Sequence, residues 1–419
     1  MLKKMVTKDL VVGMYVADVG RAWFNHPWKK KSRLLTDQAE IQELLDYGID
    51  EVYVDTEKSK VKSGPKKPFV PIAGTRAADG ALRTPPKSPV PKAPEVVSEL
   101  EIELPKAAKA YTKALDTSKA IIAACYMNKR IEMNEVQENV EELVESVTRN
   151  QDALTALIKL RHFDDYTYTH CLNVSVLSIS AGKALGLSQD DLKILGMGTM
   201  FHDLGKTRIP SYILNKPGKL TDEEFVIMKN HAALSQTIIE EQKLDVDEQV
   251  IQVARFHHER LDGSGYPDHL KGEEIPKLAT ICGLSDVYDA LTSDRVYHKG
   301  KLPHDALKFI YSLRGTHFEP YWVDRFVQSV GIYPPGSIVE LNSGHVAVVI
   351  EVDHSALLTP LIKIVADPQG QISSRPKLIN LRLEAEKTGL SIQKVIPPSE
   401  AGFDPAYYFN LKDIQGERR

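Results

Sequence analysis

The segment HHERLDGSGYP, residues 257–267, places two adjacent histidines at the end of a predicted helix, followed by a glycine-rich loop. Ahead of it, Val250, Val253 and Ala254 recur at helical spacing and put His257 on the same apolar face. The glycines and the proline then end the helix. Burying two neighbouring imidazoles without partners costs about 2 kcal/mol or more. The pair therefore indicates a site that holds a ligand or a metal ion.

The same residue types recur on the neighbouring predicted helices. A capping pattern from Thr221 to Glu224 opens a helix that runs to His231. A single inward histidine is more often a hydrogen-bonded core residue, and Asp289 fits a structural role better than a ligand role. The set as a whole still indicates a metal centre. Five predicted helices offer imidazole or carboxylate groups to one interior: His170, His202, Asp203, His231, His257, His258 and Asp286.

Imidazole and carboxylate ligands without thiolate suit iron, manganese or zinc. A carboxylate that bridges two cations holds them roughly 3.5–4 Å apart, the arrangement used for in-line attack on phosphorus, and the cations lower the pKa of a bridging water. Lys206, one helical turn beyond His202, and Arg295 are placed to hold a phosphodiester, although a solvated surface cation is the alternative for each. These residues predict phosphoryl chemistry.

Composition excludes several classes of protein. The chain has 419 residues, of which 26% are charged and 42% hydrophobic, so collagen-like, fully disordered and disulfide-scaffold proteins are excluded. Its net charge of -4 gives no overall attraction to nucleic acid or anionic membrane. No run of about 18 apolar residues occurs, and the N-terminus lacks the apolar core of a signal peptide. Three separated cysteines read as buried thiols in a reducing compartment. We expect a cytoplasmic protein.

We predict a mainly α protein with a small β-rich part at its C-terminal end. Repeated prolines and lysines, as in TPPKSPVPKAP, mark a linker, because proline favours extended backbone. The linker lacks interleaved aromatic residues, so a solvated spacer is favoured over a nucleic-acid tether. The predicted parts are a small α+β domain (1–57), the linker (58–95), connecting helices (96–149), an all-α domain (150–332) and a β-rich appendage (333–419).

The ordered motifs resemble the HD-GYP branch of the metal-dependent HD phosphohydrolases. They are HHERLDGSGYP, HDLGK (202–206), KNH ending at His231, and SDVYDALTSDRVY (285–297). The resemblance covers about residues 150–330 and implies an all-α HD core. The first 60 residues or so, with GMYV (13–16) and AWFNHPW (22–28), resemble a small domain of unknown function that often precedes HD-GYP in bacterial proteins.

The resemblance implies hydrolysis of the bacterial messenger cyclic di-GMP to pGpG, and in some relatives to GMP. It implies two divalent cations, with iron or manganese favoured; a third is not expected, because Tyr166 stands where some relatives carry a glutamate. Lys206 and Arg295 would contact phosphate. Gly265-Tyr266-Pro267 would shape the loop beside the site and meet partners such as diguanylate cyclases. The implied ligands are His170, His202, Asp203 and Asp286 for one metal, and Asp203, His231, His257 and His258 for the other.

Other functions stay open at this stage. A receptor or scaffold would bind the dinucleotide without consuming it, although an intact ligand set argues against this. An HD nucleotidohydrolase would act on deoxynucleoside triphosphates or guanosine tetraphosphate, and the Gly-Tyr-Pro loop argues against that. Cyclic GMP-AMP is an alternative substrate that no motif separates from cyclic di-GMP. The long predicted helices over 96–160 leave a homodimer open.

Overall fold

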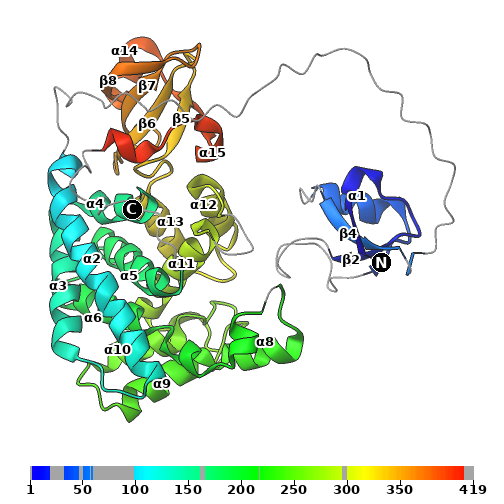
Figure 1. The fold of residues 1–419 in the computed structure, drawn as a ribbon, viewed down its shortest axis with the longest axis vertical. Helices are drawn as coiled ribbons and strands as arrows, with labels where there is room; N and C mark the ends of the chain where they lie inside the picture. Colours follow the sequence, from blue (N-terminus) through cyan, green and yellow to red (C-terminus); the bar gives the residue numbers. More distant parts are fainter. Residues whose placement is uncertain are drawn as a thin grey trace. The chain divides into compact units, whose positions relative to one another are not determined.

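The computed structural model describes residues 2–18, 33–46, 51–56, 58–59, 99–160, 166–216, 218–294 and 300–409. Contacts divide the chain into two units, residues 1–82 and residues 83–419. Figure 1 shows a small N-terminal unit, a helical bundle and a C-terminal sheet. No helix in the described part of the chain has the length and apolarity that a bilayer crossing requires.

The N-terminal unit is a four-stranded antiparallel sheet with one helix, in the strand order β1-β4-β2-β3. Its core is small and aliphatic, with Val16, Leu44 and Val52 fully buried. Its helix begins just after Asp37 and buries Ile41 and Leu44 on one face. The elements are β1 (Leu2–Val6), η1 (Thr7–Asp9), β2 (Tyr15–Asp18), β3 (Arg33–Leu34), α1 (Gln38–Asp46) and β4 (Glu51–Asp55).

The central part of the chain is helical. One apolar core joins the long α2 and α3 to α4, α5, α6 and α10, so these two helices pack within the bundle. A second core joins α5, α6 and α10 to α11, α12 and α13. The elements are α2 (Glu99–Tyr126), α3 (Met133–Arg149), α4 (Gln151–Leu160), α5 (Tyr166–Ala184), α6 (Gln189–Phe201), η2 (Leu204–Arg208), α7 (Ser211–Leu214), α8 (Asp222–Lys229), α9 (His231–Glu241), α10 (Glu248–Phe256), η3 (Gly272–Glu274), α11 (Lys277–Thr292), α12 (Pro303–Ser312) and α13 (Pro320–Val330).

The C-terminal part is a five-stranded antiparallel sheet in the order β8-β7-β6-β5-β9, as the β-rich pattern predicts. One of its faces adds Val348, Ile350 and Val365 to the helical core. At the same junction, the buried Lys363 ammonium lies 3.0 Å from the carboxylate of Glu101 on α2. The elements are β5 (Ile338–Leu341), β6 (Val346–Glu351), β7 (Leu361–Ala366), β8 (Ile372–Asn380), α14 (Leu381–Thr388), β9 (Ile392–Ile396), α15 (Pro398–Ala401) and η4 (Pro405–Tyr408).

Local sequence signals locate several helix ends. The capping box predicted at Thr221 and Glu224 forms in full and opens α8. The prediction that this helix continues to His231 is wrong, because α8 ends at Lys229 and His231 begins α9. Asn230 keeps helical backbone angles between the two helices, so the apolar periodicity does not reveal the break. The break makes His231 the first residue of its own helix.

Candidate metal centre

Seven imidazole and carboxylate side chains from five helices and the turns that follow two of them meet inside the bundle. His170 is in the first turns of α5, His202 caps the end of α6, and His231 begins α9. The His257-His258 pair follows α10, and Asp286 lies on α11. Six of these residues form two groups with ligand atoms within 4.8 Å of one another: His170, His202 and Asp203 in one, and His231, His257 and His258 in the other.

The first group surrounds the imidazole of His170. Its Nε2 lies 3.5 Å from Asp203 Oδ2 and 3.1 Å from Asp286 Oδ1. His202 Nε2 also lies 3.5 Å from Asp203 Oδ2. Three different helices or helix ends therefore direct nitrogen and oxygen atoms at one small volume. Asp286, which belongs to neither group of three, completes this side of the centre.

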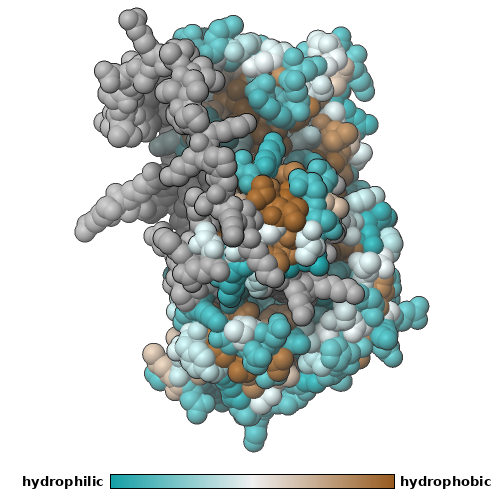
Figure 2. All heavy atoms as spheres, turned by 90° about the vertical axis from the view of Figure 1, so that its right-hand side faces the viewer, coloured by the Kyte–Doolittle hydropathy of each residue, from teal (hydrophilic) through white to brown (hydrophobic). Residues whose placement is uncertain are grey.

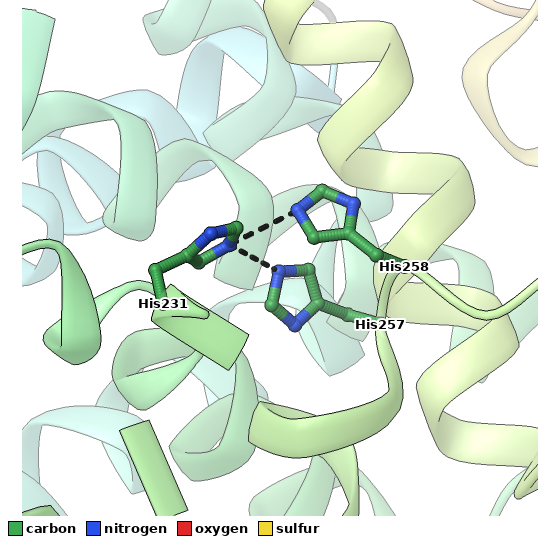
Figure 3. A group of neighbouring side chains, drawn as sticks. All are labelled: His231, His257 and His258. Atoms are coloured by element: carbon green, nitrogen blue, oxygen red, sulfur yellow. Dashed lines mark hydrogen bonds between the residues drawn. The ribbon is translucent and has the colours of Figure 1, made fainter. Parts of the chain in front are cut away.

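The second group consists of three imidazoles. Figure 3 shows the rings of His257 and His258 directed at the same nitrogen of His231. The distances from His231 Nε2 are 3.4 Å to His257 Nε2 and 3.1 Å to His258 Nε2. A neutral imidazole has one ring nitrogen that donates and one that accepts, so three converging nitrogens cannot satisfy one another fully. A cation between their lone pairs would resolve this arrangement.

Asp203 joins the two groups. Its Oδ2 faces His170 and His202, whereas its Oδ1 lies 3.5 Å from His231 Nε2. Among the described residues, Asp203 Oδ1 and His202 Nε2 are buried without a hydrogen-bond partner. Buried polar atoms of this kind are costly unless a ligand satisfies them. The donor set, imidazole and carboxylate without thiolate, therefore fits one or two divalent transition-metal ions.

Backbone carbonyl groups set the orientation of three of these imidazoles. His202 Nδ1 lies 2.6 Å from the carbonyl oxygen of Thr199, His231 Nδ1 2.7 Å from that of Met228, and His257 Nδ1 2.9 Å from that of Ala254. Each carbonyl belongs to the residue three positions earlier, at the end of a helix where such groups lack a helical donor. The proton is thereby held on Nδ1, and Nε2 keeps its lone pair for a ligand.

A carboxylate orients the fourth imidazole. Asp289 Oδ2 lies 2.7 Å from His170 Nδ1, and Asp289 Oδ1 accepts a hydrogen bond from Asn173 Nδ2 at 2.9 Å. Tyr111 on α2 donates its hydroxyl to Asn173 Oδ1 at 2.7 Å. All of these side chains are buried. The chain from Tyr111 to His170 therefore ties the long helix α2 to the centre.

Two glycines allow the backbone to come close to the site histidines. A Cβ atom on Gly205 would lie 1.9 Å from the carbonyl oxygen of His231, and one on Gly283 would lie 2.5 Å from that of His257. Gly265 plays a similar part in the glycine-rich loop, where a Cβ would lie 2.6 Å from the carbonyl oxygen of His258. A side chain at any of these positions would displace a helix end or loop that carries a candidate ligand.

Burial and neighbouring charges set the protonation of the centre. Burial lowers the pKa of His231 to about 4 and that of His258 to about 3, so both are neutral at pH 7. Burial alone would raise the pKa of Asp203, but the Lys206 ammonium and the nearby imidazoles hold it well below its usual range. Asp203 is therefore ionised, as a metal ligand must be.

Lys206 and the glycine-rich loop border the centre. The Lys206 side chain is one-third exposed, and its ammonium pairs with Asp203. Tyr266 stacks its ring on His258, with 4.6 Å between the ring centroids. Gly265 and Pro267 flank that tyrosine in the loop. Arg295 lies outside the described residues.

Comparison with known proteins also supports a metal centre of the HD-domain type. The HD domain family matches residues 132–321, a domain of unknown function (DUF3391) matches residues 2–136, and a KOW domain associated with HD domains matches residues 338–402. A protein of Pseudomonas aeruginosa named cyclic di-GMP phosphodiesterase is 32% identical over 415 residues, which cover 99% of this chain and 95% of that protein.

The chain belongs to the HD-GYP branch of the HD-domain phosphohydrolases. Other relatives match less than half of this HD-GYP protein. A cyclic di-GMP phosphodiesterase response regulator of Xanthomonas campestris is 35% identical over 47% of this chain and 50% of its own length. A 3'3'-cGAMP-specific phosphodiesterase of Vibrio cholerae is 32% identical over 39% of this chain and 31% of its own length.

Sequence reasoning did not identify every side chain that shapes this HD-GYP centre. The predicted structural role of Asp289 agrees with its contact to His170, but the motif does not indicate which histidine it holds. Nothing in the sequence around Tyr111 connects it to the site, since it lies on the apolar face of a helix far away in the chain. The side chain of Tyr166 lies outside the described residues, so the prediction of two cations, not three, stays a prediction.

Proposed function

We propose that the protein hydrolyses cyclic di-GMP to linear pGpG, or further to GMP, at a centre of two divalent cations, iron or manganese. The observation that carries the proposal is Asp203, whose two carboxylate oxygens face two separate groups of buried ligand atoms. The substrate class is supported by the relatives, which are named as phosphodiesterases of cyclic dinucleotides.

The proposed ligand sets are those that the family resemblance implies, and the distances within the two groups support them. His170, His202, Asp203 and Asp286 would hold one cation, and Asp203, His231, His257 and His258 the other. Two such cations, when bound, supply a water of lowered pKa and neutralise charge on the phosphoryl oxygens. The backbone carbonyls and Asp289 keep the imidazoles aimed, so little reorganisation is needed when phosphate enters.

Lys206 has a separate task in this proposal. Its ammonium reaches from the partly exposed rim to Asp203, so a phosphodiester placed over the centre would lie beside a fixed positive charge. Burial alone would lower the pKa of Lys206, but the charges of Asp203 and Asp286 outweigh this and raise it, so Lys206 is protonated throughout the physiological range. Arg295 stays a predicted phosphate contact, and Gly265-Tyr266-Pro267 a predicted surface for partners such as diguanylate cyclases.

The test is product formation by purified protein reconstituted with Fe(II) or Mn(II). We expect pGpG or GMP from cyclic di-GMP, and no product from an Asp203→Ala variant. Metal content measured on both proteins separates loss of chemistry from loss of the cations. Binding of cyclic di-GMP without turnover at full metal occupancy would contradict hydrolysis and favour a receptor.

A second candidate substrate is 3'3'-cGAMP, because a relative with this specificity matches 39% of the chain at 32% identity. The two dinucleotides differ in one base, and both present the same phosphodiester to the centre. Parallel assays with both, and with a deoxynucleoside triphosphate and guanosine tetraphosphate, rank the substrates by kcat/KM. A higher kcat/KM for 3'3'-cGAMP would reassign the preferred substrate and leave the centre unchanged.

A further inference from the structure

A cation from α8 lies beside the candidate metal centre and has no part in the proposed chemistry. Lys229 is the last residue of α8, and its ammonium lies 5.4 Å from the ring centroid of Phe225 and 6.0 Å from that of Tyr266. Tyr266 in turn stacks on His258. Lys229 therefore stands at the edge of the centre, separated from a candidate ligand by a single aromatic ring.

The two rings hold Lys229 in place. Phe225 and Tyr266 meet edge to face, with 6.4 Å between their centroids and an interplanar angle of 85°. A lysine ammonium near two ring faces is stabilised by their negative quadrupoles, typically by about 0.5–1 kcal/mol at exposed sites. Within the described residues, no carboxylate forms an ion pair with Lys229, whereas Lys216 and Lys206 each have one. Its charge is thus available to an anion from solution.

The surface here is open to a ligand. In Figure 1, α8 lies at the right-hand edge of the bundle, so its surface faces the viewer in the lower part of Figure 2, where apolar atoms are interspersed among hydrophilic ones. On that helix the Val226 side chain is 57% exposed, and Lys229 is half-buried. A ligand that covers the centre would reach Lys229 across Tyr266.

We propose that Lys229, held over Phe225 and Tyr266, binds the second phosphate of the cyclic dinucleotide while the first lies over the metal centre beside Lys206. A cyclic dinucleotide carries two phosphodiesters on opposite sides of one macrocycle, so the cations and Lys206 at the centre contact only one of its two phosphates. This proposal rests on the proposed function for the identity of the ligand. It makes Lys229 the residue that distinguishes a dinucleotide from a simple phosphodiester.

The experiment compares two substrates. Cyclic di-GMP has a second phosphate, and bis(p-nitrophenyl) phosphate has none. In Lys229→Met we expect KM for cyclic di-GMP to rise about tenfold, as for one lost charge-assisted hydrogen bond, with kcat nearly unchanged. The kcat/KM for bis(p-nitrophenyl) phosphate and the metal content should stay at the wild-type level. Lys229→Arg, which keeps the charge, should restore most of the affinity.

Two further variants separate this role from a structural one. Phe225→Leu removes a ring but keeps an apolar side chain, and we expect a smaller rise in KM in the same direction. Lys308→Met removes an exposed lysine from α12, and it should leave the kcat/KM for both substrates at the wild-type level. If Lys229→Met lowers the rates on both substrates equally, or changes neither, the proposal is overturned.

Binding measured by calorimetry keeps this inference apart from the proposed function. If the metal-loaded wild type binds cyclic di-GMP but does not cleave it, the proposed function fails, and weaker binding by Lys229→Met still supports the phosphate contact. If the wild type cleaves cyclic di-GMP and Lys229→Met does so with an unchanged KM, only the inference fails. If the wild type does not bind cyclic di-GMP at all, both are overturned.

Discussion

At the scale of single residues, the contact between Asp289 and His170 predicts the strength of metal binding. Asp289→Asn keeps the size of the side chain but removes the charge that holds the His170 imidazole in place. Loss of such an orienting carboxylate typically weakens metal binding about 10–100-fold. Chelator competition followed by metal analysis measures the change.

Ser293 provides a matched control for that prediction. Its hydroxyl donates to Asp289 Oδ1 at 3.0 Å, whereas His170 Nδ1 contacts the other oxygen, Oδ2. Ser293→Ala should therefore leave metal affinity within about twofold of the wild type, since the His170 contact remains. Equal metal affinity in the wild type and Asp289→Asn would show that Asp289 does not orient the ligand.

The sequence alone identifies the candidate ligands better than it identifies what holds them. Adjacent polar pairs at helix ends, such as His202-Asp203 and His257-His258, are conspicuous because burying them without partners is costly. The carbonyl groups that fix their Nδ1 atoms follow from the helix ends. By contrast, Tyr111 reaches the centre only through tertiary packing, which no local pattern reveals.

At the scale of elements, the junction of α2 with β7 depends on a buried ion pair. Lys363 and Glu101 have side chains 4% and 0% exposed, and the Lys363 ammonium also donates to the carbonyl oxygen of Tyr408 at 2.8 Å. Removing one partner of such a pair leaves an uncompensated charge, which costs about 3–5 kcal/mol. Glu101→Gln should lower the free energy of unfolding by an amount in that range, measured by denaturant titration.

A double substitution provides the control for this junction. Lys363→Met combined with Glu101→Leu replaces both charges by apolar groups of similar volume. Such replacements are often neutral or stabilising, so the double variant should recover most of the loss. A double variant as unstable as Glu101→Gln would mean that the loss comes from packing and not from the unpaired charge.

A carboxyl group at the end of β6 predicts a pH dependence. Burial and the nearby Asp152 carboxylate raise the pKa of Glu351 on β6 to about 7, above its ordinary value near 4.5. A raised pKa means that the folded protein binds the proton more tightly than the unfolded chain. Its contribution to stability is therefore complete below about pH 4.5 and is lost as the pH rises through about 7.

Glu351→Gln removes that titration. The free energy of unfolding of the variant should equal that of the wild type near pH 4.5 and exceed it by about 1 kcal/mol at pH 8. The reason is that glutamine does not ionise, whereas the wild-type carboxylate is charged in a half-buried site at that pH. His354, whose pKa is raised by Asp152 despite its burial, is close enough to lower the pKa of Glu351, so the same comparison in a His354→Gln background separates the two titrations. A difference that does not grow with pH would contradict the assignment.

At the scale of the whole molecule, the sequence predicts the classes of structure in order along the chain but not which parts share a core. The change from helical periodicity to short β patterns after residue 333 is visible in the sequence, and the five-stranded sheet confirms it. The packing of α2 and α3 into the bundle is not visible, because an apolar stripe such as Val136 to Val147 indicates burial without naming a partner. The predicted domain boundaries at 149 and 332 stay predictions.

Shared cores predict how the chain tolerates truncation. Contacts group residues 83–419 as one unit, and Val348, Ile350 and Val365 of the sheet lie in the same core as the helices. A chain of residues 83–419 should therefore fold with a melting temperature near that of the full chain and with the same metal content.

A chain of residues 1–332 would expose the apolar surface that the sheet covers and leave Glu101 without Lys363. We expect it to unfold at a lower temperature and to aggregate, because each buried side chain that becomes exposed costs about 1.5–3 kcal/mol. Thermal unfolding and light scattering of the two chains test this, and a 1–332 chain as stable as the full protein would show that the sheet is an independent appendage.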